Sequence, residues 1–179
     1  GSFEYQGQKC SAASRAYIPK SVWKAIGDDL VCEVDKIKMG DSKDFTNFMN
    51  AVIDQRAFDK ITGYIQRARD NENCEIVVGG NSNQETGWFI EPTIIVTKDP
   101  KSESMVEEIF GPVLTVYVYD DDKFEETLEL CDESSPYALT GAIFAKSEEN
   151  IQKAYNALRF TAGNFYINDK PTGAVVAQQ

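Results

Sequence analysis

The sequence predicts an α/β fold, with an open, mostly parallel sheet and helices on both faces. Runs of β-branched and aromatic residues alternate with longer stretches whose apolar residues recur every three or four positions. The connections are long enough for the crossovers that parallel strands require. The clearest strand is residues 113–119 (VLTVYVY), whose composition is typical of a strand that is buried on both faces.

The first part of the chain is expected to form a strand at residues 15–18 and then a helix. Ser21 is suited to cap this helix, and Gly40 to stop it. The apolar stripe of the helix has a spacing of four residues: Val22, Ile26, Leu30 and Val34. Residues 44–51 have no regular pattern, and we expect them to be irregular.

Three further long helices are expected in the rest of the chain. Asp54 is suited to cap the first, Asp122 the second and Ser147 the third. Their inward positions are Ala57, Phe58, Ile61, Ile65 and Ala68 in the first, Phe124, Leu128 and Cys131 in the second, and Ile151, Tyr155 and Leu158 in the third. A short helix is also expected over residues 104–107.

The remaining extended segments are expected at residues 74–78, 88–90, 93–96, 139–145 and 163–167. A glycine pair, residues 79–80, ends the first of them. No internal repeat or low-complexity linker divides the pattern, so we expect one domain over residues 3–179. The first two residues, Gly1 and Ser2, resemble a cloning remnant.

Length, composition and charge narrow the class of protein and its possible partners. The chain has 179 residues, an apolar fraction of 42% and a net charge of −11. These values indicate a globular domain and argue against nucleic acid and acidic membrane surfaces as partners. No run of the sequence is long and apolar enough to span a membrane.

The four cysteines form no CxxC pair and are Cys10, Cys32, Cys74 and Cys131. We therefore expect no metal site and no disulfide framework, and a reducing compartment. Cys32 and Cys131 fall in amphipathic helices and Cys74 opens a strand, so a structural role is expected for all three.

Cys10 differs from the other cysteines in its surroundings. It lies just past Gly7, among small and polar residues, at the mouth of a short helical pattern. A thiol reacts as its thiolate, which a helix N-terminus or a cation such as Lys9 would favour. The alternative is a small structural cysteine in the core, but Gln8 and Ser11 are poor neighbours for a dry interior.

The chain contains no histidine. Cysteine hydrolases and serine triads use a histidine base, so neither chemistry fits unless another segment supplies the imidazole. The same argument disfavours most zinc chemistry. A cysteine that attacks an aldehyde is less demanding, because the thiohemiacetal can pass a hydride to a nicotinamide. A carboxylate can then activate water against the thioester.

Two segments resemble the aldehyde dehydrogenase family. Residues 7–12 (GQKCSA) are similar to its nucleophile motif, and residues 107–113 (EEIFGPV) are similar to its second signature, in the same order. Three segments resemble the proline-catabolic branch of that family: residues 3–12, 139–144 and 163–170. Members of this branch oxidise glutamate semialdehyde, formed from delta-1-pyrroline-5-carboxylate, to glutamate. The resemblance covers residues 3–179 and implies the catalytic, cysteine-bearing domain.

The resemblance implies roles for three residues in chemistry and cofactor binding. Cys10 would be the attacking thiolate, with its backbone N–H as half of an oxyanion hole. Glu108 would accept hydrogen bonds from the ribose hydroxyls of NAD, and the Phe110 ring would pack beside the nicotinamide. In α/β proteins, functional residues usually lie in loops that follow the carboxyl ends of strands. We therefore expect the segments of Cys10, Glu108 and Phe110 to be such loops.

The resemblance also implies substrate contacts. Ser11 would contact the substrate carboxylate, although it could equally act as a local helix cap. The loop at residues 170–175 would hold the same carboxylate through the backbone N–H groups of Gly173 and Ala174. Many relatives have Ser where this chain has Ala174, which removes one hydroxyl donor and leaves the backbone donors.

The implied partners are a small aldehyde substrate and NAD, and the full-length protein would be a homo-oligomer. Its location would be the mitochondrial matrix, or the cytoplasm in a bacterium. In the family, the general-base glutamate lies in an upstream Glu-Leu-Gly-Gly motif and a second oxyanion donor, an asparagine, lies further upstream. Neither motif, nor a glycine-rich phosphate loop, occurs in the chain. We expect a truncated catalytic domain that lacks the nicotinamide-binding domain, folds, binds NAD weakly and does not turn over.

Two other functions remain open. The chain could be a non-catalytic interaction module that keeps the fold, which predicts ordinary Cys10 reactivity and no nucleotide binding. It could also belong to another substrate branch of the aldehyde dehydrogenases, which a substrate panel on the full-length protein would reveal.

Overall fold

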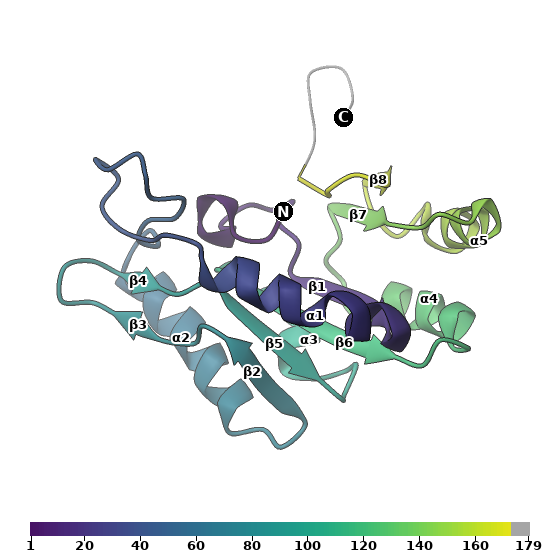
Figure 1. Ribbon diagram of the computed structural model, residues 1–179, viewed down its shortest axis with the longest axis horizontal. Coiled ribbons are helices and arrows are strands. Elements are labelled where there is room, and N and C mark those ends of the chain that lie inside the picture. Colours follow the sequence, from purple (N-terminus) through teal and green to yellow (C-terminus); the bar gives the residue numbers. More distant parts are fainter. Residues whose placement is uncertain (173–179) are drawn as a thin grey trace.

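The computed structural model describes residues 1–172 and has the α/β architecture that the sequence predicts (Figure 1). Its central sheet has four strands in the order β1-β6-β5-β2. The strands β1 (Arg15–Pro19), β6 (Val113–Tyr119) and β5 (Thr93–Thr97) are parallel, and β2 (Cys74–Val78) is antiparallel to β5. The prediction of a mostly parallel, open sheet is therefore confirmed.

Two helices, α1 (Lys20–Asp35) and α2 (Gln55–Arg69), cover opposite faces of this sheet (Figure 1). Adjacent residues of β5 supply the two cores, because successive side chains of a strand point to opposite faces. Ile94 is fully buried in the cluster that includes Val34 of α1, and Ile95 is fully buried in the cluster that includes the α2 side chains. Each such burial contributes about 1.5–3 kcal/mol.

A smaller layer stands beside the central sheet. The strands β7 (Thr140–Ile143) and β8 (Asn164–Ile167) form a parallel pair. The helices α4 (Phe124–Glu133) and α5 (Glu148–Leu158) pack against it. The residues buried between these elements are Leu128, Ala154 and Leu158.

The other elements are short. A 3₁₀ segment, η1 (Glu4–Gly7), precedes β1, and the single-turn helix α3 (Glu103–Val106) precedes β6. The strands β3 (Ser82–Asn83) and β4 (Phe89–Ile90) form a hairpin between β2 and β5. Each of η1 and α3 leads into a segment that carries residues of the two sequence motifs.

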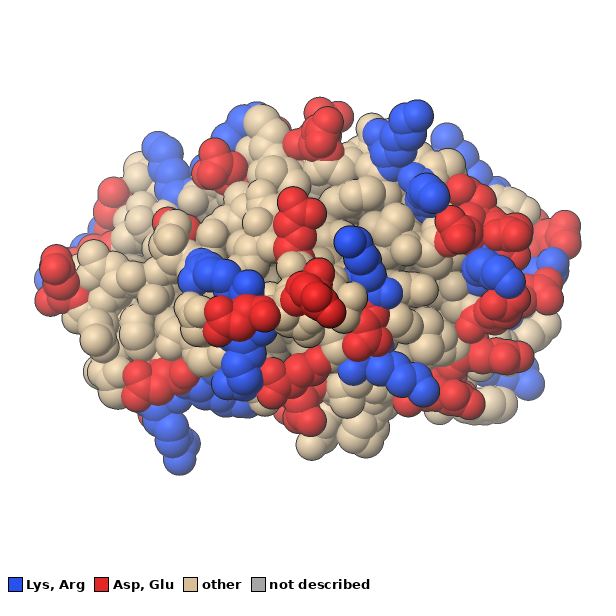
Figure 2. All heavy atoms as spheres, turned by 90° about the horizontal axis from the view of Figure 1, so that it is seen from below, with Lys and Arg blue, Asp and Glu red and all other residues tan. Residues whose placement is uncertain are grey.

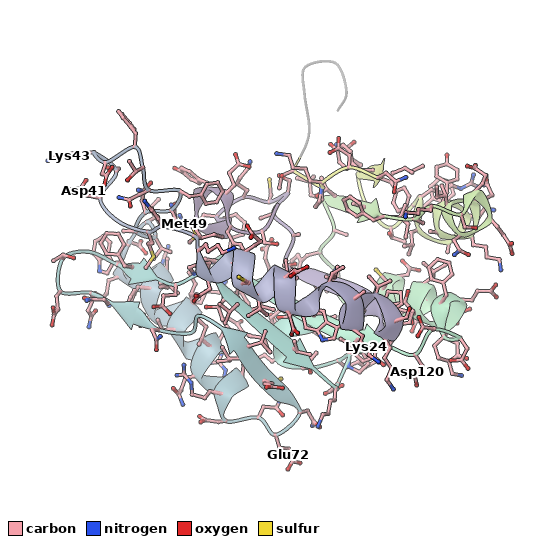
Figure 3. The ribbon with its side chains drawn as sticks, in the orientation of Figure 1. Lys24, Asp41, Lys43, Met49, Glu72 and Asp120 are labelled. Atoms are coloured by element: carbon pink, nitrogen blue, oxygen red, sulfur yellow. The ribbon has the colours of Figure 1, made fainter. Side chains whose placement is uncertain are left out.

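The connection between α1 and α2 is irregular, as expected. It is held to the core by Met49, which is fully buried and pairs through its backbone with Met39. Asp41 and Lys43 lie at the outer end of this connection (Figure 3). The buried methionine fixes the connection without regular hydrogen bonding along its length.

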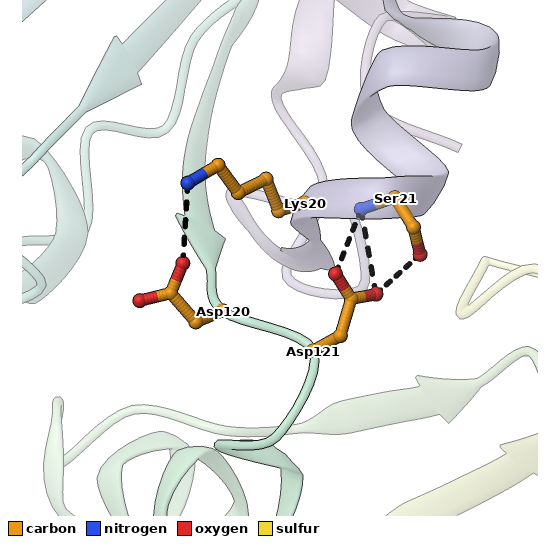
Figure 4. Close-up of polar contacts among 4 residues, drawn as sticks. All are labelled: Lys20, Ser21, Asp120 and Asp121. Atoms are coloured by element: carbon orange, nitrogen blue, oxygen red, sulfur yellow. Dashed lines mark hydrogen bonds and ion pairs between the residues drawn. The ribbon is translucent and has the colours of Figure 1, made fainter.

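The start of α1 differs from the expectation that Ser21 caps it. The helix begins at Lys20, directly after Pro19, so Ser21 already lies in the first turn. Its exposed N–H is satisfied by Asp121 instead, whose Oδ2 accepts from it at 3.2 Å, and the Ser21 hydroxyl donates to the same carboxylate (Figure 4). The neighbouring Asp120 pairs with Lys20 at 3.4 Å. A loop distant in sequence therefore caps the helix.

The predicted apolar stripe of α1 is only partly buried. Val22 and Ile26 are 41% and 45% exposed, whereas Val34 is 5% exposed. One residue turns an α-helix by about 100°, so a spacing of four drifts by about 40° at each step and winds off one face. Trp23 lies on the face toward the sheet in place of Val22.

Two details of the later helices also differ from expectation. Asp122 does not cap α4, because the helix begins at Phe124 and Lys123 occupies the cap position without a side-chain bond. Tyr155 of α5 is 39% exposed, with its ring edge-on to Phe165. The caps predicted for the other two helices are confirmed: Asp54 accepts from the Ala57 N–H at 2.7 Å, and Ser147 accepts from the Asn150 N–H at 3.4 Å.

Charged side chains of both signs are interspersed over the face seen in Figure 2, and acidic ones are numerous toward the α4–α5 end. A hollow of about 490 Å³ at that end is lined mainly by acidic side chains and Lys153. Within residues 1–172, no helix is long and apolar enough to cross a membrane. The same residues contain no cluster of three or more His, Cys, Asp or Glu side chains that could hold a metal ion.

The substitution Asp121→Ala should destabilise the chain by about 0.5–1 kcal/mol, because the first turn of α1 loses its cap acceptor. Urea denaturation followed by circular dichroism measures this change. The control is Asp120→Ala, which removes only an exposed ion pair and should cost at most about 0.5 kcal/mol. Equal effects of the two substitutions would contradict the capping role of Asp121.

Candidate active site

Cys10 lies in an exposed turn between η1 and β1. The Ala12 N–H donates to the Lys9 carbonyl across this turn at 3.0 Å, and the chain then enters the strand. The expected helix at Cys10 is wrong, because β1 follows the turn too closely for a helix to form. Cys10 therefore does not lie at the N-terminus of a helix, and Ser11 caps no helix at this position.

The segment before Cys10 reverses direction sharply. Tyr5, Gln6 and Gly7 have φ values of 53°, 57° and 65°, all in the left-handed region. The Lys9 ammonium lies 3.4 Å from the Glu4 carboxylate. This pairing ties Lys9 to η1.

Hydrogen bonds attach residues 4–12 to distant parts of the chain; we call this segment the nucleophile loop after the motif that it resembles. The Gln8 side-chain oxygen accepts from the Ile53 N–H at 2.9 Å, ahead of α2. The Ser11 carbonyl accepts from the Thr140 hydroxyl at 3.4 Å, at the start of β7. The loop is thus fixed on both sides of Cys10.

Glu108 and Phe110 lie in the turn between α3 and β6, which we call the 108–111 turn. Ile109 is 3% exposed and packs in the α2 core, so the side chains on either side of it face solvent. Phe110 has a φ of 60°, a left-handed conformation that costs about 1–3 kcal/mol unless its surroundings hold it. The Lys60 ammonium of α2 donates to the Glu108 carbonyl at 2.8 Å and helps to hold it.

The structure brings the nucleophile loop and the 108–111 turn together at one edge of the sheet. Each segment precedes one of two neighbouring parallel strands, β1 and β6, so their amino ends meet at that edge. Gly7 lies directly against the backbone of Gly111. The expectation that these segments follow the carboxyl ends of strands is therefore wrong, because both are loops that enter strands.

A hollow of about 520 Å³ opens where the two segments meet. Its lining comes from the nucleophile loop, the start of α2 and the 108–111 turn, and includes Tyr5, Gln8, Ile53, Lys60, Glu108 and Phe110. Cys10 and Ser11 lie on the same loop, beyond the residues that line it. The hollow has a carboxylate, an ammonium and aromatic rings at its wall, which suits a polar ligand with a flat ring.

Two of the expected substrate-binding residues, Gly173 and Ala174, lie outside the described residues. The loop that leads to them starts close to the nucleophile loop. A Cβ placed on Gly1 would lie 3.8 Å from Cδ of Pro171, and the Gly1 carbonyl accepts from the Ala13 N–H at 3.2 Å. The described part of this loop therefore lies near the segment that carries Cys10.

The other three cysteines differ in exposure. Cys32 is exposed on α1, and Cys74 is half-buried at the start of β2. Cys131 is half-buried beside the α4–α5 core, and burial raises the pKa of its thiol. Cys32 is therefore the natural reference for the reactivity of Cys10.

Sequence reasoning did not identify Lys60, Gln8 or the left-handed residues as parts of this site. Lys60 reaches the Glu108 carbonyl from the polar side of an amphipathic helix, where a lysine is unremarkable. Gln8 lies within the motif of residues 7–12, but the motif gives no indication that Ile53 is its hydrogen-bond partner. Only the three-dimensional contacts identify them.

The chain belongs to the aldehyde dehydrogenase family, whose model matches residues 1–179. It is 60% identical to the mitochondrial delta-1-pyrroline-5-carboxylate dehydrogenase of Dictyostelium discoideum, over all of this chain and 32% of that protein. The chain thus spans about a third of the length of the curated relatives that it matches.

Two solved structures agree with this assignment. The delta-pyrroline-5-carboxylate dehydrogenase of Mycobacterium tuberculosis matches with a TM-score of 0.95 and 48% identity, over 100% of this chain and 33% of that one. The structure of the same enzyme bound with NAD matches with a TM-score of 0.92 and 46% identity, over 100% of this chain and 32% of that one. The predicted fold and family resemblance are confirmed.

In the native chain, iodoacetamide should label Cys10 and Cys32 at least about tenfold faster than Cys131, because the buried thiol is shielded and less often ionised. Mass spectrometry of tryptic peptides after short labelling times measures the rates. If Cys10 is an activated thiol, it should also react faster than Cys32. Labelling of Cys10 as slow as that of Cys131 would contradict its exposed placement.

Proposed function

We propose that the full-length protein containing this chain is an NAD-dependent dehydrogenase that oxidises L-glutamate γ-semialdehyde to L-glutamate. The chain would contribute the cysteine-bearing catalytic domain. The net reaction consumes one aldehyde, one NAD⁺ and one water, and yields one carboxylate, NADH and two protons. A single observation carries the proposal: exposed Cys10 lies in a loop whose backbone meets the turn of Glu108 and Phe110.

The relatives support this choice of substrate. The matching proteins are named for delta-1-pyrroline-5-carboxylate, which opens with water to glutamate semialdehyde. Identities of 60% and 48% over the whole chain support the same reaction class for the full-length protein. The fold alone would not identify the substrate, since proteins with one fold have many different functions.

In the proposed mechanism, the Cys10 thiolate bonds to the aldehyde carbon and forms a thiohemiacetal. The backbone N–H of Cys10 would stabilise the oxyanion that develops on the former carbonyl oxygen. After oxidation the carbon remains on Cys10 as a thioester. Water then attacks this thioester, and the sulfur leaves as thiolate, which restores the residue.

The residues of the hollow fit the nicotinamide end of NAD. When bound, NAD supplies the acceptor for the hydride that the thiohemiacetal carbon loses. The Glu108 carboxylate is exposed and free to accept both ribose hydroxyls, and Phe110 presents its ring at the wall of the same hollow. The backbone contacts of the 108–111 turn would hold both side chains toward the ribose and the ring.

We further propose that Ser11, Gly173 and Ala174 bind the α-carboxylate of the substrate. Ser11 follows the nucleophile directly, and backbone N–H groups at Gly173 and Ala174 would form an anion-binding nest. The nearness of Pro171 to the first residue of the chain, whose carbonyl bonds to Ala13 just past the nucleophile loop, supports this arrangement.

The cellular setting is also a proposal. The eukaryotic relatives are named mitochondrial, which supports the mitochondrial matrix for a eukaryotic source. We propose a homo-oligomer for the full-length protein, which light scattering after gel filtration would test.

In the full-length protein, Cys10→Ala should lower the rate of NADH formation from glutamate semialdehyde by at least about a thousandfold, because it removes the thiol proposed to form the thioester. Absorbance at 340 nm measures the rate. The matched control is Cys32→Ser, which changes another exposed cysteine and should keep the wild-type rate. Activity retained by the Cys10→Ala protein would refute the assigned nucleophile.

The 179-residue chain alone should form no measurable NADH from the same substrates. Its sequence contains no glycine-rich phosphate loop, and the residues proposed at its hollow serve only the nicotinamide end of the dinucleotide. The loss of one oxyanion donor alone costs about a hundredfold to a thousandfold in rate. Robust turnover by the isolated chain would contradict the proposal that residues outside this chain are needed for catalysis.

A further inference from the structure

Gly7 occupies a position that only glycine can fill. Its φ is +65°, and a Cβ at this residue would lie 2.1 Å from the Gly111 carbonyl oxygen and 2.7 Å from the carbonyl carbon. Real Cβ atoms do not approach other heavy atoms closer than 3.0 Å. The absence of a side chain therefore lets two backbones from distant parts of the chain touch.

The 108–111 turn has little freedom to move away from Gly7. On its other side, the fully buried Ile61 of α2 lies so close that a Cβ on Gly111 would be 2.6 Å from its Cδ1. The Gly111 carbonyl also accepts from the Val113 N–H at 2.8 Å, which joins it to the first residue of β6. The turn is thus enclosed between the nucleophile loop and the core.

We infer that Gly7 is a positioning residue for nucleotide binding: its contact with Gly111 sets the place of Glu108 and Phe110. This inference rests on the proposed NAD site. It adds that the nucleophile loop controls cofactor affinity through a backbone contact, although Gly7 touches neither cofactor nor substrate. The contact also fixes the spacing between the Cys10 loop and the 108–111 turn, since both backbones meet there.

The substitution Gly7→Ala tests this inference in the full-length protein. The new Cβ must displace the Gly111 carbonyl, which shifts Glu108 and Phe110 from their positions at the hollow. We expect the Kd for NAD, measured by calorimetry without aldehyde, to rise at least about tenfold. The KM for NAD should rise with it.

Gly79→Ala is the matched control, because it causes the same kind of strain elsewhere. Gly79 has a φ of +73°, and its Cβ would lie 2.2 Å from the Pro92 carbonyl oxygen, where β2 ends beside β5. Both substitutions should lower the melting temperature. Only Gly7→Ala should raise the Kd for NAD by about tenfold or more. Equal weakening by both, or an unchanged Kd in Gly7→Ala, would overturn the inference.

A second substitution, at Lys60, perturbs the same turn without introducing a steric clash that could unfold the protein. Lys60 is exposed, and Lys60→Met releases the Glu108 carbonyl without touching the core. The Kd for NAD should rise several-fold, with the KM for the aldehyde unchanged, and Lys60→Arg should restore most of the affinity by donating again. Lys24→Met, on α1 (Figure 3), is the control and should bind NAD as wild type does.

Gly7→Asn complements these variants. Asparagine tolerates a left-handed backbone, so this change keeps the Cβ collision and removes much of the φ strain. It should weaken NAD binding as Gly7→Ala does. An unchanged Kd in a folded Gly7→Asn protein would overturn the inference, whatever the result for Lys60→Met.

The outcomes separate this inference from the proposed function. If the wild-type protein binds NAD and does not oxidise glutamate semialdehyde, the proposed substrate is wrong, and the comparison of Kd values still tests Gly7. If the wild type oxidises the substrate and the Gly7 variants bind NAD normally, the inference alone is wrong.

Discussion

The close approach of two backbones, at Gly7 and Gly111, is the contact on which the rest of the site depends. It brings the loop of Cys10 against the turn of Glu108 and Phe110, although the two segments are far apart in sequence. No side-chain interaction could join them as closely, because any Cβ at Gly7 would collide with a carbonyl. The proposed nucleophile and the residues proposed to face the cofactor are therefore held by one backbone contact.

The parallel sheet makes this approach possible. β1 and β6 are neighbours and run in the same direction, so the segments that enter them meet at one edge. Ile61 lies beneath this edge in the α2 core, and Ile109 packs in the same core. Because a packed interior resists small displacements, the core holds the 108–111 turn in place. The surface ion pairs, by contrast, contribute little to this arrangement.

The sequence predicts the features that depend on local signals. The composition of residues 113–119 gives β6 with its observed bounds, and Asp54 marks the start of α2. It could not predict that Asp121 caps α1, because the two partners are 100 residues apart. The family motifs likewise point to the residues proposed for the site, but not to the bond from Lys60 to the Glu108 carbonyl, which joins residues 48 positions apart. Contacts of this kind follow from the packing of elements rather than from any pattern along the chain.

The most direct test of the central claim is a crystal structure of the full-length protein with NAD bound. The account predicts that the nicotinamide ring lies between the Cys10 sulfur and the Phe110 ring, with Glu108 on the ribose and Gly7 still against Gly111. A dinucleotide bound away from the 108–111 turn, or a turn that has separated from Gly7, would contradict it.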